Sequence, residues 1–121
     1  MDFKLELVLI PVSDVDRAKE FYGRLGWRLD AEFASGDDFR VIQFTPPGSG
    51  CSVIFGKNVT AAAPGSAQGL YLIVSDIEAA RKVLLGRGVE VSDIQDFPWG
   101  RFVYFADPDG NGWAVQEIPP R

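Results

Sequence analysis

The side chains best suited to chemistry gather in one stretch, ADPDGNGW (106–113). Its Asp-x-Asp-x-Asn-Gly pattern begins at Asp107 and matches the opening of an EF-hand calcium loop. An EF-hand also needs a helix on each side and a glutamate at the twelfth loop position, which here is Ile118. Both flanks have the composition of strands. The stretch is therefore predicted to be a tight turn between two strands, and not a calcium site.

The chain contains no histidine. This absence removes the usual base at neutral pH and the commonest metal ligand, and it excludes Ser-His-Asp and Cys-His machinery. Cys51 therefore lacks a histidine to activate it as a nucleophile. Tyr71, Tyr104, Glu117 and Asp38 remain as candidate acids or bases, but that role needs a placement beside substrate that sequence does not reveal.

The overall composition excludes several classes of partner. A net charge of −5 without any concentrated basic run argues against nucleic acid as a partner. No segment has the 18 apolar residues that a membrane span requires, and the N-terminus lacks the pattern of a signal peptide. The lone Cys51 allows no intrachain disulfide and is compatible with a reducing compartment. We therefore expect one cytoplasmic domain that does not enter a membrane.

The chain repeats one pattern. Residues 12–29 read VSDVDRAKEFYGRLGWRL and residues 74–91 read VSDIEAARKVLLGRGVEV, related by a shift of 62 positions. In each copy a β-rich run precedes Asp14 or Asp76, which can cap a helix. Alternating apolar segments after each helix predict further strands. Two copies are too few for a solenoid, so we expect them to pair into one body.

The predicted order is β-α-β-β-β, written twice. The first copy has strands at 5–12, 27–33, 39–45 and 51–56 and a helix at 15–25; the second has strands at 69–74, 89–94, 101–106 and 113–118 and a helix at 77–87. The expected organisation is a single domain over 1–121, with module one at about 4–56, a linker at 57–68 and module two at about 69–118.

These paired units, the V-S-D-[VI] helix entry and the phrase WGRFVYFADPDGNGW (99–113) resemble the vicinal oxygen chelate superfamily. That superfamily includes glyoxalase I, extradiol dioxygenases, fosfomycin-resistance enzymes and bleomycin-resistance proteins. The resemblance covers about residues 4–118 and is greatest to the bleomycin-resistance and uncharacterised glyoxalase-like members. It implies an α+β fold in which two paired βαβββ modules form a curved mixed sheet around a cup.

In metal-dependent members of the superfamily, four strand residues point into the cup and bind one divalent ion. The resemblance carries these four positions onto Leu7, Ser52, Gly69 and Ala114. Such an ion needs nitrogen, sulfur or carboxylate donors, or several oxygens together, and one serine hydroxyl does not suffice. We therefore expect no metal and no cofactor.

Strand alternation places further side chains on the same face as these positions. A largely apolar concavity with a few hydrogen-bonding groups is typical of a small-molecule pocket, and flat rings suit an aromatic ligand. Trp99 stands out because it lies in a Pro/Gly-bounded loop, whereas Arg101 could bind a ligand anion or pair with Asp96 or Asp107. The predicted ligand-binding residues are Leu7, Leu9, Ser52, Ile54, Tyr71, Trp99, Arg101, Tyr104, Ala114 and Gln116.

The function predicted from these features is metal-free binding of a small apolar or aromatic molecule, with sequestration as the mechanism. The resemblance also implies a homodimer. Three alternatives stay open: a metal-dependent lyase or dioxygenase, a metal-free enzyme that uses tyrosine or glutamate as acid or base, and an accessory module with a vestigial cup. Fold resemblance alone does not choose among them.

Overall fold

The computed structural model describes residues 1–119, which form two helices and eight strands in two β-α-β-β-β modules. The first module contains β1 (Leu7–Leu9), α1 (Val15–Arg24), β2 (Arg28–Ser35), β3 (Phe39–Thr45) and β4 (Ser52–Lys57). The second contains β5 (Leu70–Val74), α2 (Ile77–Gly86), β6 (Gln95–Phe97), β7 (Gly100–Ala106) and β8 (Gly112–Glu117). The predicted α+β class with two βαβββ modules is confirmed.

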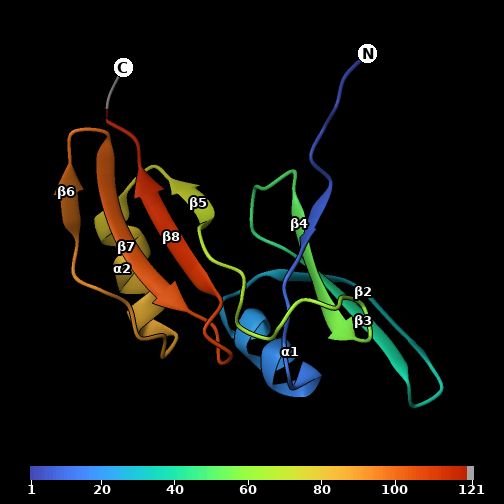
Figure 1. The fold of residues 1–121 in the computed structure, drawn as a ribbon. Coiled ribbons are helices and arrows are strands. Elements are labelled where there is room, and N and C mark those ends of the chain that lie inside the picture. Colours follow the sequence, from blue (N-terminus) through green and yellow to red (C-terminus); the bar gives the residue numbers. More distant parts are fainter. Residues whose placement is uncertain (120–121) are drawn as a thin grey trace.

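Each module forms its own four-stranded mixed sheet. The strand orders are β1-β4-β3-β2 and β5-β8-β7-β6, and the first strand of each module runs parallel to the last. Figure 1 shows the two sheets standing apart, with α1 near one end of both. Both sheets are mixed, as expected, and within residues 1–119 no strand pairing joins one to the other.

The helices begin where the sequence predicts. The side chain of Asp14 accepts a hydrogen bond from the Arg17 amide at 3.0 Å, and Asp76 accepts one from the Ala79 amide at 3.1 Å. The first helix packs against β3 and β4, and the second packs against β7 and β8. In the described part of the chain, neither helix is long and apolar enough to cross a membrane.

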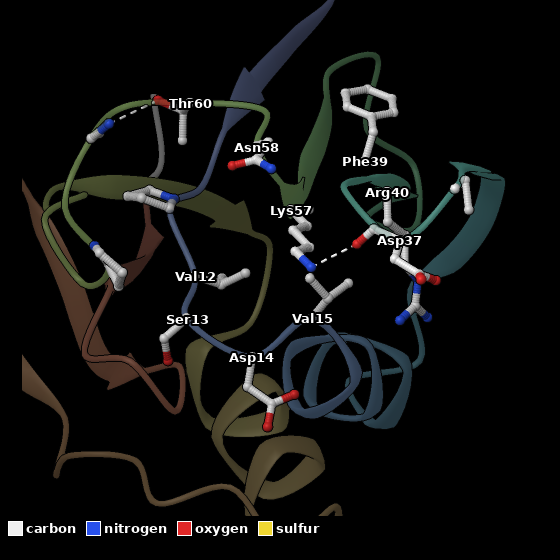
Figure 2. Close-up of a pocket in the computed structure, with 16 residues that line it drawn as sticks. Val12, Ser13, Asp14, Val15, Asp37, Phe39, Arg40, Lys57, Asn58 and Thr60 are labelled. Atoms are coloured by element: carbon white, nitrogen blue, oxygen red, sulfur yellow. Dashed lines mark hydrogen bonds between the residues drawn. The ribbon is translucent and has the colours of Figure 1, made fainter.

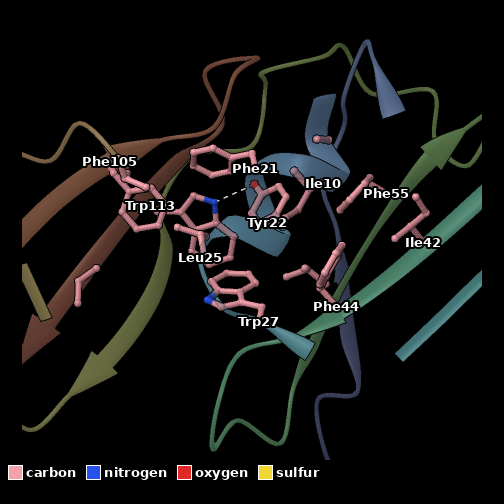
Figure 3. Packing of buried hydrophobic residues seen from close by; sticks show 14 of the residues in the cluster. Ile10, Phe21, Tyr22, Leu25, Trp27, Ile42, Phe44, Phe55, Phe105 and Trp113 are labelled. Atoms are coloured by element: carbon pink, nitrogen blue, oxygen red, sulfur yellow. Dashed lines mark hydrogen bonds between the residues drawn. The ribbon is translucent and has the colours of Figure 1, made fainter. Parts of the chain in front are cut away.

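The aromatic face of α1 contacts both sheets. The ring of Tyr22 lies 5.5 Å from the ring of Phe55 in β4 and 6.2 Å from the ring of Trp113 in β8, measured between centroids. Phe21 lies 6.2 Å from Phe105 in β7. Figure 3 shows these side chains converging from both modules. One hydrophobic core therefore runs through the two modules, with α1 as its centre.

Two expected strands differ from the structure. The strand expected at 89–94 is wrong, because the pairing begins later, at Gln95. Ser92 bonds to Tyr104 through its amide at 3.0 Å and through its hydroxyl, which accepts the Tyr104 amide at 2.9 Å, so a side chain takes the place of a strand carbonyl. The strand β1 is shorter than the expected 5–12 and ends before Pro11, which has no amide hydrogen to donate.

Candidate functional site

Five aromatic side chains lie together on the outer face of the second sheet, the face opposite α2. The rings of Phe97 and Trp99 are stacked at 5.1 Å, and those of Phe102 and Tyr104 are stacked at 6.0 Å. Tyr71 meets Phe102 edge-on at 6.3 Å. We call these five residues the aromatic wall. Trp99 is 62% exposed and Tyr71 is 59% exposed, so the wall presents flat ring surface to solvent.

A hollow of about 240 Å³ lies beside the aromatic wall. It brings together three predicted ligand-binding residues, Tyr71, Tyr104 and Ala114. Ala114 is opposite both tyrosines in the strand register and is buried, so it forms the floor. The other lining residues are Gln68, Gly69, Phe105, Gly112 and Trp113.

Gln116 anchors Trp99 at the far end of the wall. The Gln116 side-chain amide donates to the Trp99 carbonyl at 3.1 Å. The next residue, Gly100, has a φ of +155°, and a Cβ there would lie 2.9 Å from both the Gln116 side chain and the Glu117 carbonyl. Only glycine allows this close approach. The hydrogen bond and the glycine therefore fix the backbone of Trp99 beside the end of β8.

Near β1 and β4, the outer face of the first sheet is aliphatic. Leu7 lies opposite Ser52, and Leu9 lies opposite Ile54, across the β1–β4 pair. We call Leu7, Leu9 and Ile54 the aliphatic wall. The Ser52 hydroxyl is buried and lies 2.7 Å from the Thr45 hydroxyl, so its hydrogen-bonding capacity is engaged within the chain.

The repeat does not keep a constant register between the modules. A shift of 62 predicts Gly69 as the counterpart of Leu7, but Gly69 precedes β5. In the structure Tyr71 lies opposite Ala114, as Leu7 lies opposite Ser52. The cause is the connection to the helix, because residues 10–14 separate β1 from α1 and only residues 75–76 separate β5 from α2. The structural counterpart of Leu7 in the second module is therefore Tyr71, and not Gly69.

Arg101 points to the α2 side of the second sheet and does not join the aromatic wall. Its Nε donates to Asp96 at 2.8 Å, its Nη2 donates to Glu78 of α2 at 3.3 Å, and its Nη1 lies 3.6 Å from Glu117. The hydrogen bond to Asp96 raises the pKa of the guanidinium. The expected pairing with Asp96 is confirmed, and we leave Arg101 out of the candidate site.

The Asp-rich stretch is a turn, as predicted, because β7 ends at Ala106 and β8 begins at Gly112. The Asp107 carboxylate accepts hydrogen bonds from the amides of Asp109 and Asn111 and from the Asn111 side chain. Among residues 1–119, no group of three or more His, Cys, Asp or Glu side chains could hold a metal ion. The donors on the two walls do not fit the divalent ion of the metal-dependent relatives.

A second hollow, of about 700 Å³, lies beyond the N-terminus of α1 (Figure 2). Three of its charged side chains, those of Lys57, Arg40 and Asp14, already have partners in the chain. Lys57 donates to the Asp37 carbonyl at 2.6 Å, and Arg40 pairs with Asp16 at 2.8 Å. Asp14 caps α1 through the Arg17 amide. This polar hollow was not predicted from sequence, and it lacks the ring surface of the aromatic wall.

The sequence profile of the Glyoxalase/Bleomycin resistance protein/Dioxygenase superfamily matches residues 4–115. The chain belongs to this superfamily. The matched residues include all members of both walls and the turn between β7 and β8. The superfamily contains both binding proteins and enzymes, so membership leaves the activity to be argued from the site.

Among solved structures, the chain is similar to TnmS3, described as an antibiotic binding protein from Streptomyces sp. CB03234, with 34% identity, 98% of each chain covered and a TM-score of 0.86. A glyoxalase/bleomycin resistance protein from the same strain is 36% identical, over 94% of this chain and 100% of the other, with a TM-score of 0.79. Protein YetH of Bacillus subtilis (strain 168), described as uncharacterized, is 26% identical over 91% of this chain and 94% of its own length.

Two members of the aromatic wall, Phe97 and Phe102, were not predicted as site residues. Phe102 lies two positions from Tyr104 in β7, so strand alternation was a sufficient signal to place it on the wall. Phe97 was hidden by the wrong strand boundary, which left residues 95–100 outside any strand. Its ring stacks on the Trp99 indole and so packs against one face of that exposed side chain.

Proposed function

We propose that this protein binds a small, flat, apolar or aromatic molecule without a metal, and acts by sequestering it. The observation that carries the proposal is the aromatic wall, in which Tyr71 and Tyr104 line a hollow of about 240 Å³ and Trp99 adds a further exposed ring. Ring faces favour offset stacking with a planar ligand. The 34% identity to TnmS3, an antibiotic binding protein, over 98% of both chains supports binding of a small molecule.

We also propose that the working unit is a homodimer. The first strand of each module is an open sheet edge within residues 1–119. Near these edges lie Phe3, Leu5 and Ile73, which are 92%, 70% and 59% exposed. Exposed apolar side chains beside an unpaired edge favour association with another chain. In a symmetric dimer, the aliphatic wall of one copy can close over the aromatic wall of its partner.

The proposal places the protein in the cytoplasm, where a lone half-buried Cys51 stays reduced. It assigns no acid, base or nucleophile to the site. Tyr71 and Tyr104 would contact the ligand with their rings, and Gln116 would hold Trp99 in place. Sequestration then requires only that the ligand leave water for the space between the walls.

Calorimetric titration with a panel of planar aromatic antibiotics tests the proposed function. We expect at least one to bind the wild type at a stoichiometry of one per chain, and to bind Trp99→Ala at least tenfold more weakly. The matched control is Val83→Ala, which removes an exposed apolar side chain from α2, away from both walls. Equal binding by wild type and Trp99→Ala would refute the assignment of the wall.

The dimer has a separate test. Light scattering should give twice the chain mass for the wild type and the single chain mass for Ile73→Asp, because a carboxylate at that edge opposes burial. A monomeric wild type at high concentration would contradict the dimer but would leave ligand binding to the aromatic wall open to titration.

A further inference from the structure

A buried hydrogen-bond network joins the two modules at the turn between β7 and β8. Asp107 is 5% exposed, and its carboxylate accepts a hydrogen bond from the Tyr22 hydroxyl of α1 at 2.8 Å. The Tyr22 oxygen in turn accepts the indole N–H of Trp113 at 3.1 Å (Figure 3). The Asn111 side chain donates to the same carboxylate at 2.8 Å. We call Tyr22, Asp107, Asn111 and Trp113 the inter-module latch.

The turn that carries the latch also holds the β1–α1 connection and the linker. The Asn111 side chain donates to the Pro11 carbonyl at 2.8 Å and accepts the Ala67 amide at 3.0 Å. At the surface, Ser13 donates to Asp109 through its hydroxyl at 2.5 Å and through its amide at 3.1 Å. The turn of module two is therefore bound to the linker and to the start of α1.

The same segments build one end of the hollow beside the aromatic wall. Gln68 and Gly69 directly follow the clamped Ala67, and Gly112 and Trp113 directly follow Asn111. All four line the hollow. Displacing the latch would move this rim relative to Tyr71 and Tyr104. Sites lose affinity when the groups that support their lining residues are loosened.

We infer that the latch positions the hollow for its ligand, so that Tyr22 and Asp107 are positioning residues of the binding site although neither lines it. This inference rests on the proposed function. It adds a role for buried residues that are distant in sequence from the linker they orient, and it assigns the D-P-D-G-N stretch a purpose beyond turning the chain.

The hydrogen bonds of the latch are suited to holding the two modules in one fixed arrangement. Burial, and then the charge of Asp107, raise the pKa of the Tyr22 phenol, so its hydroxyl stays a donor. Removing that hydroxyl leaves the Trp113 N–H without its acceptor in a buried site. If Tyr22 only stabilised the fold, removing its hydroxyl would lower stability alone. If Tyr22 positions the hollow, removing its hydroxyl also changes the ligand affinity and the placement of one sheet relative to the other.

The test compares Tyr22→Phe with Val103→Ala, a core variant of β7 whose side chain does not line the hollow. The probe is anilinonaphthalene sulfonate, and Tyr71→Ala, which removes a ring that lines the hollow, identifies the fraction bound at this part of the aromatic wall. In a Cys51→Ser background, nitroxide labels at Ser35→Cys and Glu90→Cys report the distance between the modules, with unlabelled protein added to isolate distances within one chain. Asp107→Asn serves as a second latch variant.

We expect Tyr22→Phe and Asp107→Asn to weaken probe binding at the wall at least fivefold and to broaden the distance distribution. Val103→Ala should lower the melting temperature while changing the affinity less than twofold. Unchanged affinity in Tyr22→Phe, or the same loss in Val103→Ala, would overturn the positioning role. If the wild type itself binds no probe at the wall, the proposed function fails, and the distance distributions still decide whether the latch fixes the modules.

Discussion

The two walls are built on the same βαβββ scaffold but carry different chemistry. In the first module Leu7 lies opposite Ser52, and in the second Tyr71 lies opposite Ala114. Likewise Thr45 hydrogen-bonds to Ser52, while Tyr104 lies opposite Ala114. The positions are equivalent, but the second module has rings where the first has short or aliphatic side chains. The two modules therefore share a framework and differ in the side chains at their outward positions.

The difference decides which wall orients a ligand. Aliphatic side chains offer non-directional apolar contact, whereas stacked rings favour a planar ligand parallel to them. The pairs Phe97–Trp99 and Phe102–Tyr104 have interplanar angles of 6° and 4°. The Phe97 and Phe102 rings meet at 71°, so a planar ligand can lie parallel to only one of these pairs. Under the proposed function, that pair would orient the ligand and the aliphatic wall would cover it.

Each wall lies on the outer face of a sheet whose inner face packs in the hydrophobic core, and the largest expected effect tests this assignment of faces. Phe55 is fully buried on the inner face of the first sheet, and Phe33 is exposed. We expect Phe55→Ala to lower the free energy of unfolding by about 3–5 kcal/mol, because it opens a cavity. Phe33→Ala should lower it by less than about 0.5 kcal/mol. Urea denaturation measures both, and equal losses would contradict the assignment of faces.

Truncating one side chain of each wall tests how much each wall contributes to ligand affinity. With a planar aromatic ligand identified, Trp99→Ala should weaken binding at least tenfold, about 1.4 kcal/mol, because the exposed stacking surface is lost. Leu9→Ala should weaken it about threefold. Calorimetry gives both affinities. A larger loss in Leu9→Ala would reverse the roles of the two walls.

The dependence of stability on alkaline pH tests the inter-module latch. The pKa of Tyr22 is raised in the folded state by burial and by Asp107, so the folded chain keeps a proton that the unfolded chain releases above pH of about 10. The contribution to stability is therefore complete below that pH and is lost as the pH rises further. The stability of the wild type should fall by up to about 1.4 kcal/mol per pH unit from this group.

Denaturation at increasing pH measures that slope. Tyr22→Phe is less stable at neutral pH but should lack the contribution of Tyr22 to the slope. Identical slopes in the two proteins would show that the phenol ionises equally in the folded and unfolded states.

The smallest expected effect concerns metal. Neither wall carries a donor set that fits a divalent ion, so chelator should leave the melting temperature and the ligand affinity unchanged. The control is glyoxalase-type relatives that bind metal, treated in the same way. A drop in melting temperature with chelator, restored by one divalent ion per chain, would contradict a metal-free site.

Sequence reasoning located the modules because helix caps and strand alternation are local signals. Asp14 and Asp76 cap their helices by bonding within one turn, so their role is visible in the sequence. Ser92 replaces a strand carbonyl through a partner in another strand, and Tyr22 finds Asp107 across the two modules. Such contacts depend on packing, which explains why the β6 boundary, Phe97 and the latch were not predicted.

The register of the repeat failed for a related reason. A constant shift of 62 holds for the helix entries but not for the strands before them, because the β1–α1 connection is longer than the β5–α2 connection. Helix entries are aligned by their capping residues, whereas strand register depends on the neighbouring strand. Tyr71, rather than Gly69, therefore lies across from Ala114.

A crystal structure of the protein with a planar aromatic antibiotic that it binds would test the central claim most directly. We predict electron density for a flat ring system stacked on Tyr104, above the hollow floored by Ala114, with no ion coordinated beside it. A ligand seated instead in the polar hollow beyond α1, or an ion held by protein atoms between the walls, would contradict the account.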